Sequence, residues 1–491
     1  MNTVKNTQTK TFDYLISQGK NTEYGRKHNF SAIKDLNDYK NNVPVNTYED
    51  FQPYIDRMKM GEKHILWPGA ITDYAVSAGT SGKGKHIPLS KERFKSDQKF
   101  MRRVVLKYLS QTNNVFSVLG SHVSLPGNID TLDSNPDVNI GEISAYLAKK
   151  SPAWLSLFQI RSPEKMIKEQ WAEKFERCLE KAIECDVRQI TAVPSWALRF
   201  FQRALEKTGK YSIQEVWPNL KVLICGGEDI KTYLPHFEYL CRGLNMDYVE
   251  NYGASEGYFA FSDDLNHSDL RLTIDNGLFY EWVPYPKNNP RDIVLQNTIP
   301  TWEVEAGIPY AMIVTNNSGL WRYCINDIIE FTNPQSTRIK VLGRTSEMLD
   351  RFGEALQGHQ AEEVLCKTVK QVGAEFSSFI MGGLLEDNQS SPHHLWFIQW
   401  VKKPDNLEQF IALLDNNLRE SNRRYAIRRE GETIAGLKVY ELDQDILHRW
   451  KYENMQAGAQ TKVPRIILDD DKLIALKRLC DSNSDTVMID G

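Results

Sequence analysis

Helix patterns and strand patterns alternate along the whole of this 491-residue chain, and this alternation restricts its possible folds more than any other feature. Residues 163–183 predict one amphipathic helix, because Ile167, Trp171, Phe175 and Leu179 recur at helical spacing. Residues 220–225 predict a buried strand that ends on a glycine pair, and MDYVENYGASEG predicts a strand that runs into a tight turn. The sequence therefore favours an α/β fold over a helical bundle or a β-sandwich.

The pattern changes twice toward the C-terminus. After Tyr310, the closely spaced segments YAMIVT, WRYCINDIIEF and IKVLG predict a hairpin-rich region. From about Leu349 the chain has helices and strands of its own, among them AEEVLCKTVKQV, LWFIQWV and LKVYEL. We therefore expect a large domain with mixed sheets and a β-rich subdomain over residues 1–345, and a smaller α+β domain over 346–491.

Composition excludes several classes of partner. The 60 basic residues nearly balance the 64 acidic ones, so no strong field favours nucleic acid or an anionic membrane, and a small-molecule partner is expected. The sequence has no signal-like apolar run and no stretch near about 20 apolar residues, which predicts a cytoplasmic protein. The seven cysteines lack CxxC spacing, and His393 and His394 are neighbours on a predicted strand, so neither group predicts a metal site.

Small, hydroxyl-bearing and basic side chains are densest between Val76 and Lys85, in the segment VSAGTSGKGK. Glycines let backbone N–H groups turn toward an anion, hydroxyls donate to phosphate oxygens and lysine adds charge, so the segment predicts a polyphosphate loop. A Walker A loop fits less well, because His86 stands where a serine or threonine must reach Mg²⁺, and Pro88 disfavours the helix that this motif opens. The alternative is a surface loop without a ligand.

The loop resembles the phosphate loop of the acyl-adenylate-forming enzymes. Three further motifs follow in the order of that superfamily: Gly226-Gly227-Glu228 after a strand, Tyr252-Gly253-Ala254-Ser255-Glu256 about 25 residues on, and Asp327 within LWRYCINDII. More narrowly, TEYGRKHNF, VPVNTYEDFQPYIDRM, GEKHILWPG and GAQTKVPR resemble the Gretchen Hagen, or auxin-responsive promoter, family of acyl acid amido synthetases. This likeness runs from about residue 22 to residue 465.

The resemblance implies a two-step reaction that uses ATP and Mg²⁺. A carboxylic acid and ATP would give acyl-AMP and pyrophosphate, and the amine of an amino acid would then displace AMP to form an amide. It also implies an adenylate-forming large domain and a mobile small domain that carries Lys462.

The resemblance also assigns roles to single residues. Glu256 would bind Mg²⁺ and count as catalytic, and Lys462 would reach the α-phosphate and the substrate carboxylate as the second catalytic residue. Tyr252 would stack on the adenine, and Asp327 and Arg344 would lie at the ribose. The residues expected to bind ATP are Ser77, Gly79, Thr80, Ser81, Gly82, Lys85, Gly226, Gly227, Tyr252, Gly253, Ala254, Ser255, Asp327 and Arg344. The alternatives are a solvated turn glutamate, a structural aspartate, a core tyrosine and a surface lysine.

Three positions depart from the wider superfamily pattern. Ala78 replaces a hydroxyl residue, Asn326 replaces the glycine before Asp327, and Cys324 replaces an arginine. These departures keep open a catalytically idle regulator that binds ATP or an acid. An acyl-CoA ligase, which shares the first half-reaction, is the main alternative. Aromatic candidates for the acid pocket are Trp196, Phe200 and Phe259, and no histidine is nominated as the base of the second step.

Overall fold

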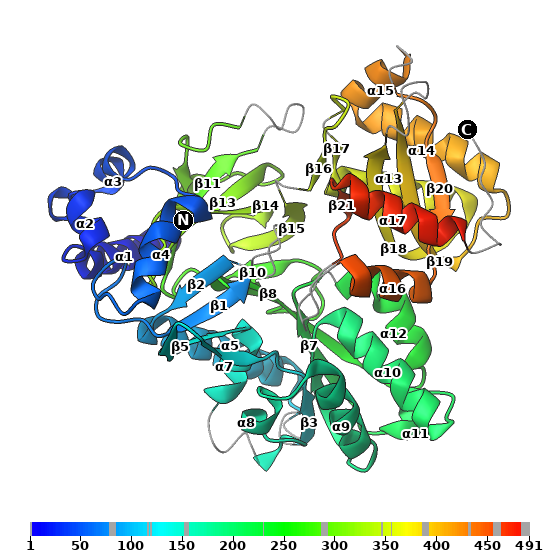
Figure 1. Cartoon of the computed structure of the whole chain (residues 1–491), viewed down its shortest axis with the longest axis horizontal. Coiled ribbons are helices and arrows are strands. Elements are labelled where there is room, and N and C mark those ends of the chain that lie inside the picture. The colour runs from blue at the N-terminus through cyan, green and yellow to red at the C-terminus, as the bar shows by residue number, and fades with distance from the viewer. Residues whose placement is uncertain are drawn as a thin grey trace.

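The computed structural model in Figure 1 describes residues 2–77, 85–114, 117, 120–151, 157–228, 230–285, 293–344, 347–354, 356–384, 392–430, 434–454 and 463–482. The helices are α1 (Asn2–Gly19), α2 (Glu23–Lys27), α3 (Leu36–Asn42), α4 (Tyr48–Lys59), α5 (Lys91–Thr112), α7 (Ile143–Lys149), α8 (Pro163–Met166), α9 (Trp171–Ile183), α10 (Pro194–Thr208), α11 (Ile213–Val216), α12 (Leu234–Leu240), α13 (Gly358–Val372), α14 (Leu407–Ser421), α15 (Arg423–Glu430), α16 (Gln444–Asn454) and α17 (Asp470–Asp481). The strands are β1 (Asp73–Ser77), β2 (Lys85–Leu89), β3 (Ser121–Ser124), β4 (Ile129–Leu132), β5 (Asn135–Gly141), β6 (Val187–Thr191), β7 (Val222–Gly226), β8 (Asp247–Ala254), β9 (Gly257–Phe261), β10 (Leu270–Leu272), β11 (Leu278–Pro284), β12 (Ile299–Pro300), β13 (Pro309–Asn316), β14 (Tyr323–Asn333), β15 (Arg338–Arg344), β16 (Met348–Leu349), β17 (Leu356–Gln357), β18 (Glu375–Leu384), β19 (His393–Lys402), β20 (Lys438–Glu441) and β21 (Ile466–Ile467).

The largest sheet combines a parallel half and an antiparallel half. Its strand order is β12-β11-β13-β14-β15-β10-β9-β8-β7-β6-β3. At one end of this order, the neighbouring strands β3, β6, β7 and β8 pair in parallel. All other neighbours in the order, from β8 and β9 to β11 and β12, pair antiparallel. Parallel neighbours need long crossover segments, which α9, α10 and α12 supply between successive strands. The mixed α/β fold predicted from the sequence is confirmed.

One face of the parallel strands is covered by these crossover helices. Val123, Ile190 and Leu223 point into a buried cluster with apolar residues of α9, α10 and α12. Because side chains alternate along a strand, their neighbours His122, Gln189 and Ile224 face the other side of the sheet. That other side is one wall of the cleft described below.

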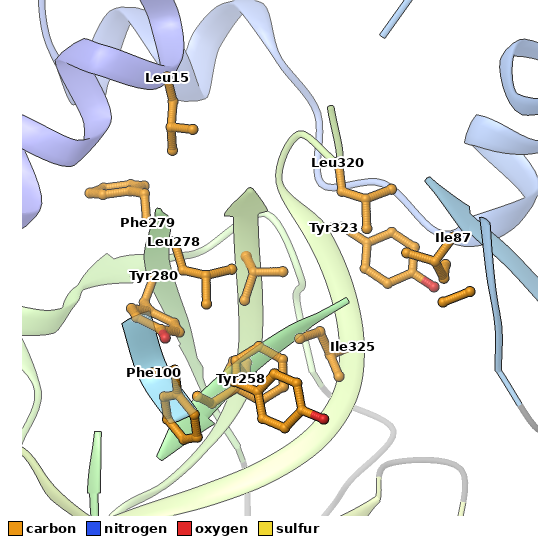
Figure 2. Close-up of a cluster of buried hydrophobic side chains, with 14 of the residues drawn as sticks. Leu15, Ile87, Phe100, Tyr258, Leu278, Phe279, Tyr280, Leu320, Tyr323 and Ile325 are labelled. Carbon is orange, nitrogen blue, oxygen red and sulfur yellow. The ribbon is translucent and has the colours of Figure 1, made fainter. Parts of the chain in front are cut away.

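The N-terminal helices share a core with the large sheet. Figure 2 shows Leu15 of α1 near Phe279 of β11, and Phe100 of α5 beside Tyr258 of β9. The carboxamide of Gln8 on α1 also donates to the backbone oxygens of residues 274 and 278, at 2.6 and 2.9 Å. A second sheet, with the order β2-β1-β5-β4, packs into the same hydrophobic cluster.

The C-terminal part contains a separate sheet with helices on both faces (Figure 1). Its strand order is β20-β19-β18-β21. Along β19, Trp396 and Ile398 pack with α13 and α14, and Leu395 and Phe397 pack with α16 and α17. This period-two alternation buries both faces of the sheet. The predicted boundary at residues 345 and 346 lies outside the described residues, so the division into two domains stays a prediction.

The prediction of one continuous helix over residues 163–183 is wrong. The structure has two helices there, α8 and α9, and the backbone of Gln170 between them is extended, with φ −61° and ψ 145°. The carboxylate of Glu169 binds Arg161 at 2.7 Å, and its backbone oxygen accepts from Asn128 at 2.9 Å. These tertiary contacts hold the break, which periodicity alone does not reveal. In the described part of the chain, no helix is long and apolar enough to cross a membrane.

Candidate active site

A cleft of about 1870 Å³ lies between the large sheet and the C-terminal part. Its lining includes the ends of β1, β7 and β8 on one side, and residues of β18, α16 and the segment 463–465 on the other. Pockets for one drug-sized ligand measure about 300–1,000 Å³, so this cleft has room for more than one small molecule.

The predicted phosphate loop connects two antiparallel strands at the edge of this cleft. The backbone of Ser77 in β1 pairs with Lys85 in β2, and Ala78, Gly79, Thr80, Ser81 and Gly82 lie outside the described residues. The loop is followed by strand β2 rather than by a helix, which agrees with the rejection of a Walker A site. The Ser255 hydroxyl donates to the backbone oxygen of Val76 at 3.4 Å, so the loop begins beside the YGASE motif.

The glycine pair lies at the carboxyl end of β7, where α/β sheets commonly bind ligands. A methyl group on Gly226 would lie 2.4 Å from the backbone oxygen of Asn251, so no larger residue fits there. Gly227 has a φ of +88°, a backbone conformation that residues other than glycine rarely adopt. Both residues line the cleft, so a flat ligand group can approach the backbone closely.

Tyr252, Asp327 and Arg344 meet through hydrogen bonds, although they come from three different strands. The Tyr252 hydroxyl donates to Asp327 Oδ2 at 2.5 Å, and Arg344 Nε donates to Asp327 Oδ1 at 2.9 Å. Asp327 is buried, and 44% of the Arg344 side chain is exposed toward the cleft. The nearby carboxylate raises the pKa of the Arg344 guanidinium. The hydroxyl of Tyr252 thus orients an acidic side chain, a contact beyond the aromatic stacking that the sequence predicts.

Glu256 occupies the tight turn between β8 and β9, with its neighbours Gly253, Ala254 and Ser255 also on the cleft wall. It is only 6% exposed, and burial raises the pKa of its carboxyl group. The positive charges of Arg344 and Lys85 oppose this shift. A buried carboxylate with a raised pKa is stabilised in its charged form when a cation binds beside it.

Sequence reasoning missed the residues that hold Glu256 in place. Arg93 on α5 donates to the Glu256 backbone oxygen, and Asn316 donates to the same oxygen at 3.0 Å. Arg93 is itself buried and paired with Asp97 at 2.8 Å. Burial and the charge of the nearby Glu256 carboxylate raise the pKa of the Tyr323 hydroxyl. The spacing of Arg93 and Asp97, four residues apart on one helix, is a sequence signal for an ion pair, but it does not indicate a contact with Glu256.

Three models of one family match the chain. They are the GH3 family N-terminal domain over residues 1–167, the GH3 family central domain over 271–344 and the GH3 family C-terminal domain over 359–471. Together they match more than half of the chain. The chain belongs to the GH3 family. The family resemblance inferred from the motifs is confirmed.

Curated relatives and solved structures agree with this assignment. The indole-3-acetic acid-amido synthetase GH3.4 of Arabidopsis thaliana is 22% identical over 456 residues, which cover 80% of this chain and 76% of that protein. The AtGH3.15 acyl acid amido synthetase in complex with 2,4-DB has a TM-score of 0.80 at 17% identity, covering 97% of this chain and 93% of that one. A 2-hydroxyisobutyryl-CoA ligase in the postadenylation state has a TM-score of 0.57 at 13% identity, covering 98% and 92%. The chain therefore shares its fold with these two solved structures.

The departures from the superfamily pattern have local explanations in this GH3 chain. Asn326 has a φ of +68°, in the left-handed region that glycine favours and asparagine tolerates better than most residues. Its side-chain oxygen accepts from the Cys324 thiol at 3.3 Å. Asn326 and Cys324 are therefore compatible with the backbone conformation that places Asp327 at the cleft. Ala78 lies outside the described residues.

The remaining predictions have mixed outcomes. Lys462 lies outside the described residues, although the next residues, 463–465, line the cleft and Arg465 pairs with Glu362 at 2.9 Å. Trp196 lines the cleft as expected. Phe200 and Phe259 do not, because both are fully buried in the hydrophobic cores on the two faces of the large sheet.

Proposed function

We propose that this GH3 chain is an ATP-dependent acyl acid amido synthetase. In the first step, a carboxylate oxygen attacks the α-phosphorus of ATP, which gives acyl-AMP and releases pyrophosphate. In the second step, the neutral amine of an amino acid attacks the acyl carbon, which forms the amide and releases AMP and a proton. The observation that carries the proposal is that Gly226, Glu256 and the Asp327–Arg344 pair line one cleft beside the ends of the glycine-rich loop.

The cleft offers chemically suitable groups for each part of ATP. The backbone at Gly226 and Gly227 is open to the adenine, and Asp327 accepts hydrogen bonds from ribose hydroxyls while Tyr252 and Arg344 hold its carboxylate still. Lys85 is placed at the end of the phosphate loop, where its charge attracts phosphate oxygens. These roles extend the family resemblance and stay proposals for this chain.

Glu256 fits a magnesium ion that is shared with the nucleotide. Mg²⁺ commonly binds proteins through one or two carboxylates and takes its other ligands from phosphates and water. The described residues contain no group of three or more potential metal ligands, which accords with such a partial site. Mg²⁺ would neutralise phosphate charge there, and its charge would also offset the cost of keeping Glu256 ionised in a buried position.

Catalysis in this proposal depends on charge neutralisation and positioning rather than on a covalent enzyme intermediate. The carboxylate and the triphosphate are both anions, so Arg344 and Lys85 reduce the repulsion as they approach. By resemblance, Lys462 adds positive charge at the α-phosphate. Cys324, the cysteine nearest in sequence to Asp327, is buried, and burial raises the pKa of its thiol to about 11. It is therefore protonated near neutral pH and a poor nucleophile.

An acyl-CoA ligase is the main competing function, because a CoA ligase shares this fold over nearly the whole chain. The test is pyrophosphate release from ATP and Mg²⁺ over a panel of aryl and aliphatic acids, with amino acids, with coenzyme A and with neither acceptor. The proposal predicts turnover that amino acids stimulate, and an amide mass among the products. Stimulation by coenzyme A alone would identify a ligase, and ATP binding without pyrophosphate release would identify a regulator.

A further inference from the structure

The wall of the cleft that β3 and β6 form is polar over a continuous area. His122 and Ser124 of β3 face the cleft, and so do Gln189 and Thr191 of β6. The strand register places His122 beside Gln189 and Ser124 beside Thr191, so the four side chains form two adjacent rows. Gln159 extends the first row, because its backbone forms a β-bridge with His122.

Two acceptor atoms on this polar wall are buried without a hydrogen-bond partner in the described part of the chain. They are the side-chain oxygen Oε1 of Gln159 and the hydroxyl oxygen of Ser124. A buried polar atom left without a partner is costly, and native proteins satisfy nearly all such atoms. Both residues line the cleft, so a ligand in the cleft can supply the missing donors.

The polar wall presents no fixed charge to a ligand. His122 is 8% exposed, and burial lowers the pKa of its imidazole to about 4, so the ring is neutral near pH 7. A neutral imidazole has one donor and one acceptor nitrogen, and Ser124 and Gln159 also combine donor and acceptor capacity. Hydroxyl groups match this pattern, because each of them both donates and accepts.

A second part of the cleft lining, on α5 and α7, is largely apolar. Met101, Val105 and Leu109 of α5 belong to it, at positions three to four residues apart on one helix face, together with Leu147 of α7. A ligand that contacts both parts of the lining meets hydrocarbon in one and hydrogen-bonding groups in the other. A purely apolar acid would leave the polar groups of β3 and β6 without hydrogen-bond partners. A fully polar acid would make no apolar contacts with α5 and α7.

We propose that the acid substrate of this chain has an apolar body that bears hydroxyl groups along one side, and that Gln159, Ser124 and His122 select it through those hydroxyls. This inference rests on the proposed function for the site, since it names the class of acid that the cleft activates. It identifies the β3 and β6 wall as the element that determines specificity.

The first test compares acids that differ only by hydroxyl against methyl, which have similar volumes. The pairs are 3,4-dihydroxybenzoate with 3,4-dimethylbenzoate, and the corresponding 3-phenylpropanoates. Each acid is assayed for pyrophosphate release with ATP, Mg²⁺ and an amino acid mixture, and for binding alone by fluorescence, since Trp196 lines the cleft. In at least one pair, the dihydroxy acid should have a kcat/KM about tenfold higher or more, and should bind more tightly by a similar factor.

Variants then locate the selectivity. The double variant Gln159→Leu and Ser124→Ala removes the unpartnered polar atoms and should shift the hydroxyl-to-methyl ratio toward the methyl acid by about tenfold or more. The control Gln170→Leu makes the same exchange at an exposed position outside the cleft and should leave the ratio unchanged. Because the readout is a ratio measured on one protein, a partial loss of folded enzyme cancels.

The outcomes separate this inference from the proposed function. Preferential binding of dihydroxy acids without pyrophosphate release would support the polar wall as a selective site and count against the synthetase. If pyrophosphate is released and kcat/KM for each methyl acid equals or exceeds that for its dihydroxy partner, the synthetase is supported and the inference is overturned. Unchanged ratios in the double variant would also overturn it.

Discussion

Replacing Asp327 with asparagine keeps the shape of the side chain and removes its charge. In the native protein, one carboxylate oxygen accepts from the Tyr252 hydroxyl at 2.5 Å and the other accepts from Arg344 at 2.9 Å. In the variant, the single amide oxygen can still accept from Arg344, and the amide nitrogen can donate to Tyr252 if that hydroxyl turns. Both contacts survive, but neither has a charged acceptor.

The expected cost follows from these two contacts. A hydrogen bond to a charged group contributes about 1.5–3 kcal/mol and a neutral one about 0.5–1.5 kcal/mol, so two weakened bonds would cost about 2 kcal/mol. Because 44% of the Arg344 side chain is exposed, solvent screening reduces its share, and we expect the free energy of unfolding to fall by about 1–2 kcal/mol. The ribose hydroxyls would lose a charged acceptor as well, so kcat/KM for ATP should fall about 10- to 100-fold.

A matched control separates folding from nucleotide binding. Asp263 is also buried and paired with arginine, at 2.8 Å from Arg338, but it lies outside the cleft. Asp263→Asn should lower stability by a similar amount in urea denaturation and leave kcat/KM for ATP within about twofold. If Asp327→Asn also leaves kcat/KM for ATP unchanged, Asp327 is a structural residue and its assignment to the ribose is wrong.

Three further substitutions test other parts of the site. Because burial raises the folded-state pKa of Glu256, its ionised form costs stability near pH 7. Without Mg²⁺ and ATP, Glu256→Gln should therefore be at least as stable as the parent, an advantage that shrinks as the pH falls through the raised pKa and is nearly gone at the ordinary value of 4.5. Its pyrophosphate release should nevertheless fall about 100-fold, and near-normal release would exclude a metal role. Gly226→Ala puts a methyl group 2.4 Å from the Asn251 backbone oxygen and should lower the free energy of unfolding by about 1–3 kcal/mol, measured by thermal unfolding. The control Gly358→Ala, whose new methyl group has no atom closer than 3.4 Å, should lower it less. Lys462→Ala should slow adenylation and spare amide formation from supplied acyl-AMP, and equal loss of both half-reactions would contradict that division.

Much of the architecture could be predicted, because strong local patterns determine it. The segment around residues 220–225 forms β7, and the apolar segments after Tyr310 form the antiparallel strands β13, β14 and β15. In each of them, apolar side chains alternate or run continuously over a short segment bounded by turn residues, a pattern typical of a half-buried or fully buried strand. The segments TEYGRKHNF, VPVNTYEDFQPYIDRM, GEKHILWPG and GAQTKVPR also indicated the family, which the three matched models confirm.

The details that sequence missed are tertiary contacts between distant segments. Nothing near Glu256 in the sequence indicates that Arg93 and Asn316 hold its backbone oxygen, because these contacts join residues 163 and 60 positions apart. The break between α8 and α9 likewise depends on Arg161 and Asn128 rather than on the helical pattern itself. The alternation in the segment SHVS, by contrast, is a local signal that could have placed His122 and Ser124 on one face of a strand.

The most direct test of the proposed chemistry follows one oxygen atom. An acid substrate labelled with ¹⁸O in its carboxylate is incubated with the enzyme, ATP, Mg²⁺ and an amino acid, and the products are analysed by mass spectrometry. Formation of an acyl-adenylate transfers one carboxylate oxygen to the nucleotide, so AMP should be about 2 Da heavier than unlabelled AMP. Label in inorganic phosphate together with ADP would instead indicate an acyl phosphate, and unlabelled AMP alongside the amide would contradict an acyl-adenylate.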